Sequence, residues 1–492
     1  MRKRTSGQPS GISWARIGQR NDVRKEEKPV EGYTLRDLEE WDQKIHDLVQ
    51  EMGLDCYPQE FEICDYYQML GYLAYNGMPA HYPHWSFGKA FEKQKTLYDY
   101  GMSGLPYEMV INSSPALAYL MRDNSLSLQI LTIAHVYGHN DFFKNNRTFR
   151  FSYPGYTLEM FKAHADRIRT YIEDPSIGLE RVERTMDAAH ALSLQCQRHL
   201  EVKKLSTQEQ RQRLQERTWK RSKEFPQFNE PDEDLDLNKV PLEPEEDILF
   251  FMRDYNPYLA DWQRDILTIV AEETHYFIPQ METKIMNEGW ATYCHYQILN
   301  ALDLPQGLYM EFLVHHNQVI RPVPGGLNPY YLGFRTFQEI EKRWGAEGKK
   351  RIFQARESDR DVSFLRQYLT EELMRELGLF AHEKRGTDRV ITHISDEENW
   401  KVVKDVLLKN VGLVALPVIK ILDANYRGQQ ALYLWHEYDG RELELSYAQQ
   451  TLRYLFDLWQ RRVILESRLE GKPVFLSYDG RNSVKITYQL LS

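Results

Sequence analysis

The chain of 492 residues has few of the features that mark secreted or membrane proteins. Its four cysteines are too few for a disulfide framework in so long a chain, which favours a reduced, cytoplasmic protein. No run of about 18 apolar residues is present, so the sequence predicts no transmembrane segment. The basic N-terminus is not followed by an apolar stretch, which argues against a secretory signal.

An excess of positive charge is also missing. The net charge of −10 argues against nucleic acid as the main partner. Charged residues make up 27% of the chain and hydrophobic residues 42%, which is typical of a globular protein. The length allows at least one large core and roughly two to four domains.

Changes in composition along the chain predict three parts. Residues 1–32 are basic and carry no hydrophobic period, which indicates a mobile arm. Residues 33–384 have mainly helical patterning, interrupted by an exposed acidic loop at 225–247. Residues 385–492 alternate in the manner of strands and also contain two helical stretches. We therefore expect a mainly α N-terminal domain and a smaller α+β domain with an antiparallel sheet.

Individual elements follow from apolar period, caps and turn residues. Helices are predicted at 34–52, 62–76, 126–139, 155–200, 203–224, 258–278, 284–300, 304–318, 328–344, 396–410 and 447–461. Strands are predicted at 107–112, 389–394, 417–423, 431–437, 473–478 and 484–488.

A pair of histidines in the apolar helix at 126–139 is the strongest chemical signal. His135 and His139 are four residues apart, so they project from the same helix face and can bind one metal ion. Asp141 and Asn145 are candidates to orient the two imidazoles through hydrogen bonds. Glu288, 149 residues after His139 on the predicted helix 284–300, is the candidate carboxylate ligand.

The segment around Glu288, Asn287-Glu-Gly-Trp-Ala291, resembles the Asn-Glu-Gly-Phe-Ala segment of gluzincin metallopeptidases. In those enzymes this glutamate, on the second helix of the site, is the third zinc ligand. Zincin-like metal-site helices are therefore possible in the N-terminal domain. The resemblance implies a catalytic zinc site made by two histidines and Glu288, with an open position for water. Iron and manganese are alternatives. Val136 stands where the general base of an H-E-x-x-H motif would be.

The leading hypothesis is a zinc-dependent hydrolase that cuts an amide bond. Glu272 or Glu273 would replace the missing base, and His295 or Tyr137 would stabilise the developing oxyanion. If this is correct, removal of either glutamate abolishes activity and leaves the metal content unchanged.

Two alternatives remain open. Glu272 and His275 have the Glu-x-x-His spacing of di-metal carboxylate proteins, so an oxidase-like site could combine them with His135, His139 and Glu288. In the other alternative, the same side chains form a buried hydrogen-bond network in a non-enzymatic regulatory protein of sporulation or cell-envelope assembly.

Longer segments of the chain resemble the stage V sporulation protein R (SpoVR-like) family. These segments are Tyr107–Asn112, Ala134–Asn146, Pro279–Ala291 and Asn328–Arg335. The resemblance runs from about residue 33 to the end of the chain. It implies a cytoplasmic protein linked to spore cortex formation, with a peptide or peptidoglycan precursor as the expected substrate. Neither the patterns nor the resemblance defines an oligomeric state.

Overall fold

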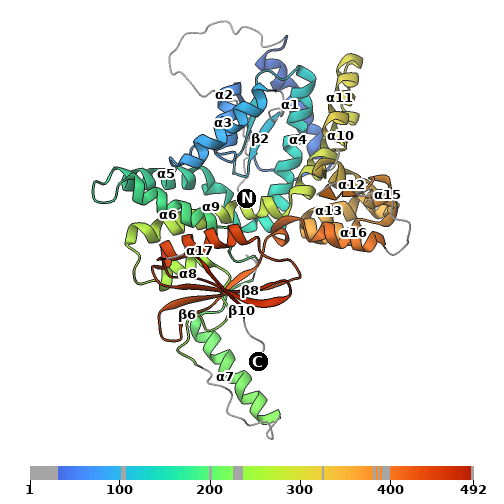
Figure 1. Cartoon of the computed structure of the whole chain (residues 1–492). Coiled ribbons are helices and arrows are strands. Elements are labelled where there is room, and N and C mark those ends of the chain that lie inside the picture. The colour runs from blue at the N-terminus through green and yellow to red at the C-terminus, as the bar shows by residue number, and fades with distance from the viewer. Residues whose placement is uncertain are drawn as a thin grey trace, which may run out of the picture. The chain divides into compact units, whose positions relative to one another are not determined.

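The computed structural model describes residues 32–100, 107–198, 202–224, 236–323, 326–379, 384–385, 388–389, 399–481 and 483–488. The chain forms two compact units (Figure 1). The first unit runs up to Asp166 and continues from Ile278 to Gly412. The second comprises Arg167–Phe277 and the chain from Leu413 onward. The predicted basic arm, residues 225–235 of the predicted acidic loop and most of the predicted strand at 389–394 lie outside the described residues.

The first unit is mainly helical. Its helices are α1 (Leu35–Glu51), α2 (Tyr66–Ala74), α3 (Trp85–Asp99), α4 (Leu126–Asn145), α10 (Lys284–Ala301), α11 (Gln306–Val319), α12 (Pro329–Trp344), α13 (Gly348–Ser358), α14 (Asp361–Tyr368), α15 (Glu371–Glu376) and α16 (Asn399–Leu408). Three strands form one sheet in the order β1 (Gln59–Cys64), β3 (Ala116–Met121) and β2 (Glu108–Ile111). The central strand β3 pairs parallel with β1 and antiparallel with β2. The short strands β4 (Lys384–Arg385) and β5 (Asp388–Arg389) pair with each other.

Helix α4 lies at the centre of this unit, and every residue from Ser127 to Phe143 is buried. It packs against α1, α10 and α11, and α10 packs in turn against α12. Because buried polar groups need hydrogen-bond partners, the histidines, asparagine and aspartate in the second half of α4 must be satisfied by neighbouring elements.

Glycines let the central helices approach at backbone distance. A Cβ atom added to Gly138 of α4 would lie 2.6 Å from the Cα of Ala291 in α10. Gly289 of α10 faces Gly333 of α12, and a Cβ on Gly289 would lie 2.4 Å from the Cα of Gly333. These crossings hold α4 and α10 close enough for side chains of both helices to meet.

The second unit combines helices with a five-stranded sheet. The strands are β6 (Ile419–Tyr426), β7 (Ala431–His436), β8 (Val463–Leu469), β9 (Lys472–Tyr478) and β10 (Lys485–Tyr488), in the order β10-β9-β8-β7-β6. All neighbouring strands are antiparallel except β7 and β8, which are parallel. Its helices are α6 (Leu179–Leu192), α7 (Thr207–Glu224), α8 (Ile248–Tyr255) and α17 (Leu445–Trp459). α5 (Thr157–Glu173) and α9 (Asp261–Glu282) each span a boundary between the units along the chain.

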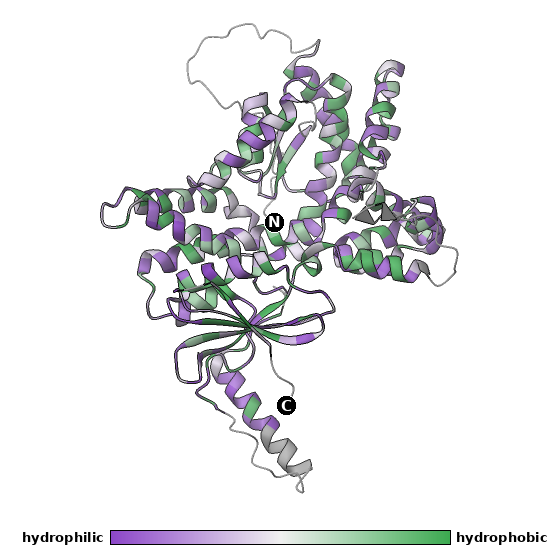
Figure 2. Ribbon diagram, viewed as in Figure 1, coloured by the Kyte–Doolittle hydropathy of each residue, from purple (hydrophilic) through white to green (hydrophobic). Residues whose placement is uncertain are grey.

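Within this unit, α17 packs against β8, β9 and α6, and its apolar stripe of Leu452, Leu455 and Leu458 is buried. In Figure 2 the strands carry much of the unit's hydrophobic colour, whereas the coloured part of α7 is largely hydrophilic. The solvated helix that the sequence predicts at 203–224 therefore has the expected character.

The predicted fold class is confirmed: a large helical region is accompanied by a smaller sheet-containing α+β region. The predicted helix at 62–76 was wrong at its start, because residues Gln59–Cys64 pair with β3 and the helix begins only at Tyr66. Strands β3 and β8 were not predicted. In the described part of the chain, no helix has both the length and the apolar character to cross a membrane.

Candidate metal centre

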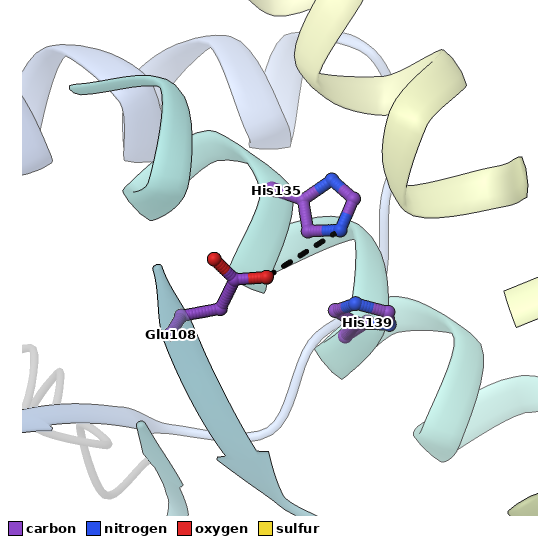
Figure 3. Close-up of side chains that lie close together, drawn as sticks. All are labelled: Glu108, His135 and His139. Carbon is purple, nitrogen blue, oxygen red and sulfur yellow. Dashed lines mark ion pairs between the residues drawn. The ribbon is translucent and has the colours of Figure 1, made fainter. Parts of the chain in front are cut away.

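Four side chains from three elements of the first unit converge on one point. They are Glu108 at the start of β2, His135 and His139 on α4, and Glu288 on α10. One ligand atom each of Glu108, His135 and His139 lies within 4.8 Å of the others. Figure 3 shows the Glu108 carboxylate extending from its strand toward the His135 ring, with His139 one turn further along the helix.

The separations between these atoms match ligands around a shared ion better than direct hydrogen bonds. The Glu288 Oε2 atom lies 3.4 Å from His139 Nε2 and 3.8 Å from His135 Nε2. The Glu108 Oε1 atom is also 3.8 Å from His135 Nε2. Two atoms bound tetrahedrally at about 2.1 Å from zinc stand about 3.4 Å apart. Oε2 of Glu288 is buried and forms no hydrogen bond with any described residue, so this oxygen is available as a ligand.

The other ring nitrogen of each histidine is held by α10. His139 Nδ1 lies 2.9 Å from Oδ1 of Asn287, and His135 Nδ1 lies 2.9 Å from Nδ1 of His295. An Nδ1–H that donates to Asn287 leaves the lone pair of His139 on Nε2, which faces Glu288. Metal-binding histidines are typically oriented in this way.

Charges at the site favour an anionic Glu288 and a basic His139. Burial alone would raise the pKa of Glu288, but His135 and His139 hold it well below its ordinary value. Burial would lower the pKa of His139, yet Glu288, Asn287 and Glu108 together raise it. The pKa of Glu108 is raised by burial, against the opposing effect of the two histidines. A carboxylate held between two imidazoles in this way can share either a proton or a metal cation with them.

The structure brings together the three metal ligands that the sequence predicts, His135, His139 and Glu288. Both nitrogens of His295 are engaged, with His135 and with His316. The hydroxyl of Tyr137 donates to Asp42 at 2.9 Å, and its ring lies on the helix face opposite to the histidine pair. No contact in the described structure supports an oxyanion role for either residue, and those roles stay predictions.

The predicted bases belong to the other compact unit of the chain. Glu272, Glu273 and His275 are on α9, in the part of the chain that belongs to the second unit. His275 Nε2 lies 3.7 Å from a carboxylate oxygen of Asp247 in that unit. The di-metal alternative and the roles of Glu272 and Glu273 stay predictions.

Four residues at the site were not predicted: Glu108, Asn287, His316 and Tyr330. The Tyr330 ring on the first turn of α12 lies 6.0 Å from the His135 ring, and the charge of Glu288 with burial raises its pKa. Glu108, Asn287 and Tyr330 fall within the segments that carry the family resemblance, so those segments were the available signal. His316 had none.

In the first unit, one strand and two central helices bring histidine and glutamate side chains together. The fold and the site define a class of protein: a mainly helical protein with a buried candidate metal centre. The chain belongs to the SpoVR-like family, because the family model "SpoVR like protein" matches residues 32–416 and "SpoVR-like C-terminal domain" matches residues 417–470. It is similar to the Escherichia coli (strain K12) protein named "Uncharacterized protein YcgB". The two are 35% identical over 460 residues, which cover 86% of this chain and 90% of the relative. No solved structure matches the chain.

Proposed function

We propose that the chain is a metal-dependent hydrolase in which His135, His139 and Glu288 hold one divalent cation. The observation that carries this proposal is the buried Oε2 atom of Glu288, which faces both Nε2 atoms and accepts no hydrogen bond from described residues. Two imidazoles and one carboxylate are the ligand set of many catalytic zinc sites. When bound, zinc would lower the pKa of a coordinated water to about 7.

Glu108 is the best-placed base for such a reaction. It comes from strand β2 and its Oε1 atom lies 3.8 Å from His135 Nε2, so we assign to it the role that Val136 leaves open. Because burial raises its pKa, the carboxylate is suited to accept a proton and pass it to a leaving amine. Tyr330, near both His135 and Glu288, is suited to donate a hydrogen bond to a developing oxyanion.

The proposed substrate class is an amide bond in a peptide or peptidoglycan precursor. The chemistry of the ligand set supports the amide bond, and the link to spore cortex formation that the family resemblance implies supports peptidoglycan. The local likeness to gluzincin metallopeptidases supports the amide bond, but it does not bear on peptidoglycan.

Elemental analysis of the purified protein tests the metal site. We expect one zinc per chain, and less than a tenth of that in a His135→Ala, His139→Ala double variant and in Glu288→Ala. One iron or manganese would keep the site and change the reaction class. Two irons per chain would support the oxidase-like alternative, and a chain unable to bind zinc or iron would support the regulatory one.

Conservative amide variants then identify the base. In Glu108→Gln we expect the zinc to remain and the release of amines from purified peptidoglycan, followed by mass spectrometry, to fall 10²- to 10⁴-fold, the usual contribution of general base catalysis. Glu272→Gln and Glu273→Gln are the matched tests of the sequence-based assignment. If Glu272→Gln or Glu273→Gln lost activity while Glu108→Gln stayed active, the general base would be assigned to α9.

A further inference from the structure

Three buried imidazoles form a continuous chain that leads away from the candidate metal centre. His135 Nδ1 lies 2.9 Å from His295 Nδ1, and His295 Nε2 lies 2.8 Å from His316 Nδ1. The chain starts on α4, crosses α10 and ends on α11. All three side chains are at least 96% buried, since their exposed fractions are 3%, 0% and 4%.

We infer that His295 and His316 are positioning residues that fix the tautomer of His135, so that its Nε2 atom presents a lone pair to a cation. The inference rests on the proposed metal site. It adds two residues to that site, His295 on α10 and His316 on α11. Each nitrogen–nitrogen contact contains one proton, so a chain of neutral rings can be oriented in only two directions.

Only one direction leaves Nε2 of His135 free for a cation. If His135 Nδ1–H donates to His295 and His295 Nε2–H donates to His316, then His135 Nε2 is free to bind metal. In the opposite direction Nε2 would carry a proton, and the carboxylate oxygens of Glu108 and Glu288 are each 3.8 Å away. A protonated Nε2 cannot bind a metal ion, so only the first direction is compatible with the proposed site.

The neighbouring ligand provides an internal comparison. Asn287, on the same helix as His295, holds Nδ1 of His139 through its amide oxygen at 2.9 Å. An amide oxygen is an acceptor whatever its surroundings. An imidazole in the same role can donate or accept at Nδ1, so His295 needs a further residue to set its own direction. His316 Nδ1 provides the acceptor for His295 in the direction that leaves Nε2 of His135 free for a cation.

The ring of His316 is itself held by aromatic packing. Its centroid lies 4.9 Å from Tyr296, 5.3 Å from Phe334 and 6.0 Å from Phe312. These contacts from α10, α12 and α11 restrain the ring and keep its Nδ1 atom directed at His295.

Zinc affinity, measured by competition with a chromophoric chelator, tests the inference. His316→Leu removes the acceptor and should weaken zinc binding about 10- to 100-fold, the usual effect of losing a partner of a metal ligand. His316→Asn places an amide oxygen near the position of Nδ1 and should restore the affinity to within a few-fold. His315→Leu, next to it on α11 with its Nε2 atom 3.6 Å from Glu311 instead, is the matched control and should bind zinc normally.

A double-variant comparison separates positioning from packing. In His295→Asn the amide oxygen can accept from His135 without any help from α11, as Asn287 does for His139. We therefore expect His316→Leu to have no further effect on zinc affinity when it is combined with His295→Asn. An equal loss in both backgrounds would show that His316 acts only through packing, and would overturn the inference, as would unchanged affinity in His316→Leu alone.

Nitrogen-15 chemical shifts of the histidine rings in metal-free protein give a readout independent of metal and activity. We expect His135 to be protonated at Nδ1 in the wild type and to lose that preference in His316→Leu. A wild type protonated at Nε2 would overturn the inference. A wild type with the expected tautomer but no zinc affinity would overturn the proposed function and leave the histidine chain intact.

Discussion

Asp141 is a buried carboxylate two residues after the candidate ligand His139, and its contacts join distant parts of the fold. Its Oδ1 atom accepts from the backbone N–H of Asp55 at 2.8 Å and from Arg356 at 3.1 Å, and Oδ2 accepts from Trp290 at 2.8 Å. The sequence suggested that Asp141 and Asn145 would orient the imidazoles. Asn287 and His295 have that position instead, because on α4 the carboxylate of Asp141 projects away from the face shared by the histidines.

Replacement of Asp141 should therefore cost stability. Asp141→Asn leaves the buried guanidinium of Arg356 without its counter-charge, and removing one partner of a buried ion pair typically costs about 3–5 kcal/mol. Urea unfolding measures the loss. The control is Asp55→Asn, which removes an exposed carboxylate paired with Lys144 and should cost less than about 1 kcal/mol. Similar losses in the two variants would contradict this role of Asp141.

The sequence predicted the candidate ligands that share a helix face or a recognisable motif, but not the site residues brought together only by packing. His135 and His139 follow from helical spacing, and Glu288 follows from its motif. The contribution of Glu108 depends on how strand β2 lies against α4, and His316 depends on the crossing of α10 and α11. No local pattern encodes either arrangement, so these residues emerge only from the tertiary structure.

Among the elements, the crossing of α4 and α10 controls whether the ligands meet. Gly138→Ala would place a methyl group 2.6 Å from the Cα of Ala291, so the two helices must separate. We expect a loss of about 1–3 kcal/mol in unfolding free energy, as for other overpacked sites, and weaker zinc binding. Gly71→Ala is the control, because an added Cβ there in α2 has no neighbour within 4 Å. Zinc affinity unchanged by Gly138→Ala would argue against this role of the crossing.

The contact between α1 and α4 should depend on pH. Asp42 accepts from Tyr137, and burial raises the pKa of Asp42 from 3.8 to about 6 although this hydrogen bond lowers it. A raised pKa means that the folded protein holds the proton more tightly than the unfolded chain, so ionisation of Asp42 removes stability as pH rises from about 4 to 6.

Asp42→Asn keeps an acceptor for Tyr137 and removes the ionisation. The unfolding free energy of the wild type should therefore fall relative to Asp42→Asn between pH 4 and pH 7, by up to about 3 kcal/mol for a shift of about two units. Unfolding experiments in urea at a series of pH values provide the comparison. A difference that stays constant over this range would show that Asp42 ionises normally.

Element prediction failed where pairing between distant strands outweighs local preference. Residues Gln59–Cys64 lie partly within an interval that was predicted as helix, yet they form β1 because all six residues pair with β3. Residues Lys284–Ala301 match the predicted helix closely, since no proline interrupts them and Leu302 leaves the helical conformation. Burial on all sides of α4 also hides the amphipathic pattern from which helix orientation is usually read.

At the scale of the whole molecule, a cation would join segments that are far apart in the sequence. The three proposed ligands and the proposed base come from β2, α4 and α10, and all belong to the first unit. Without a cation, the carboxylates of Glu108 and Glu288 remain in one buried cluster and repel each other, as the effect of Glu288 in raising the pKa of Glu108 indicates. Metal binding should therefore stabilise the first unit and leave the second unit unaffected.

Scanning calorimetry with and without zinc tests this expectation. At a free zinc concentration about 1,000 times the Kd, binding to the folded state alone contributes about 4 kcal/mol. We expect zinc to raise the Tm of one unfolding transition and a chelator to lower it again, with the transition of the second unit unchanged. In the His135→Ala, His139→Ala variant neither transition should respond. A zinc-dependent shift that persists in this variant would place the stabilising ion elsewhere, because the ligands on α4 would then not be needed to bind it.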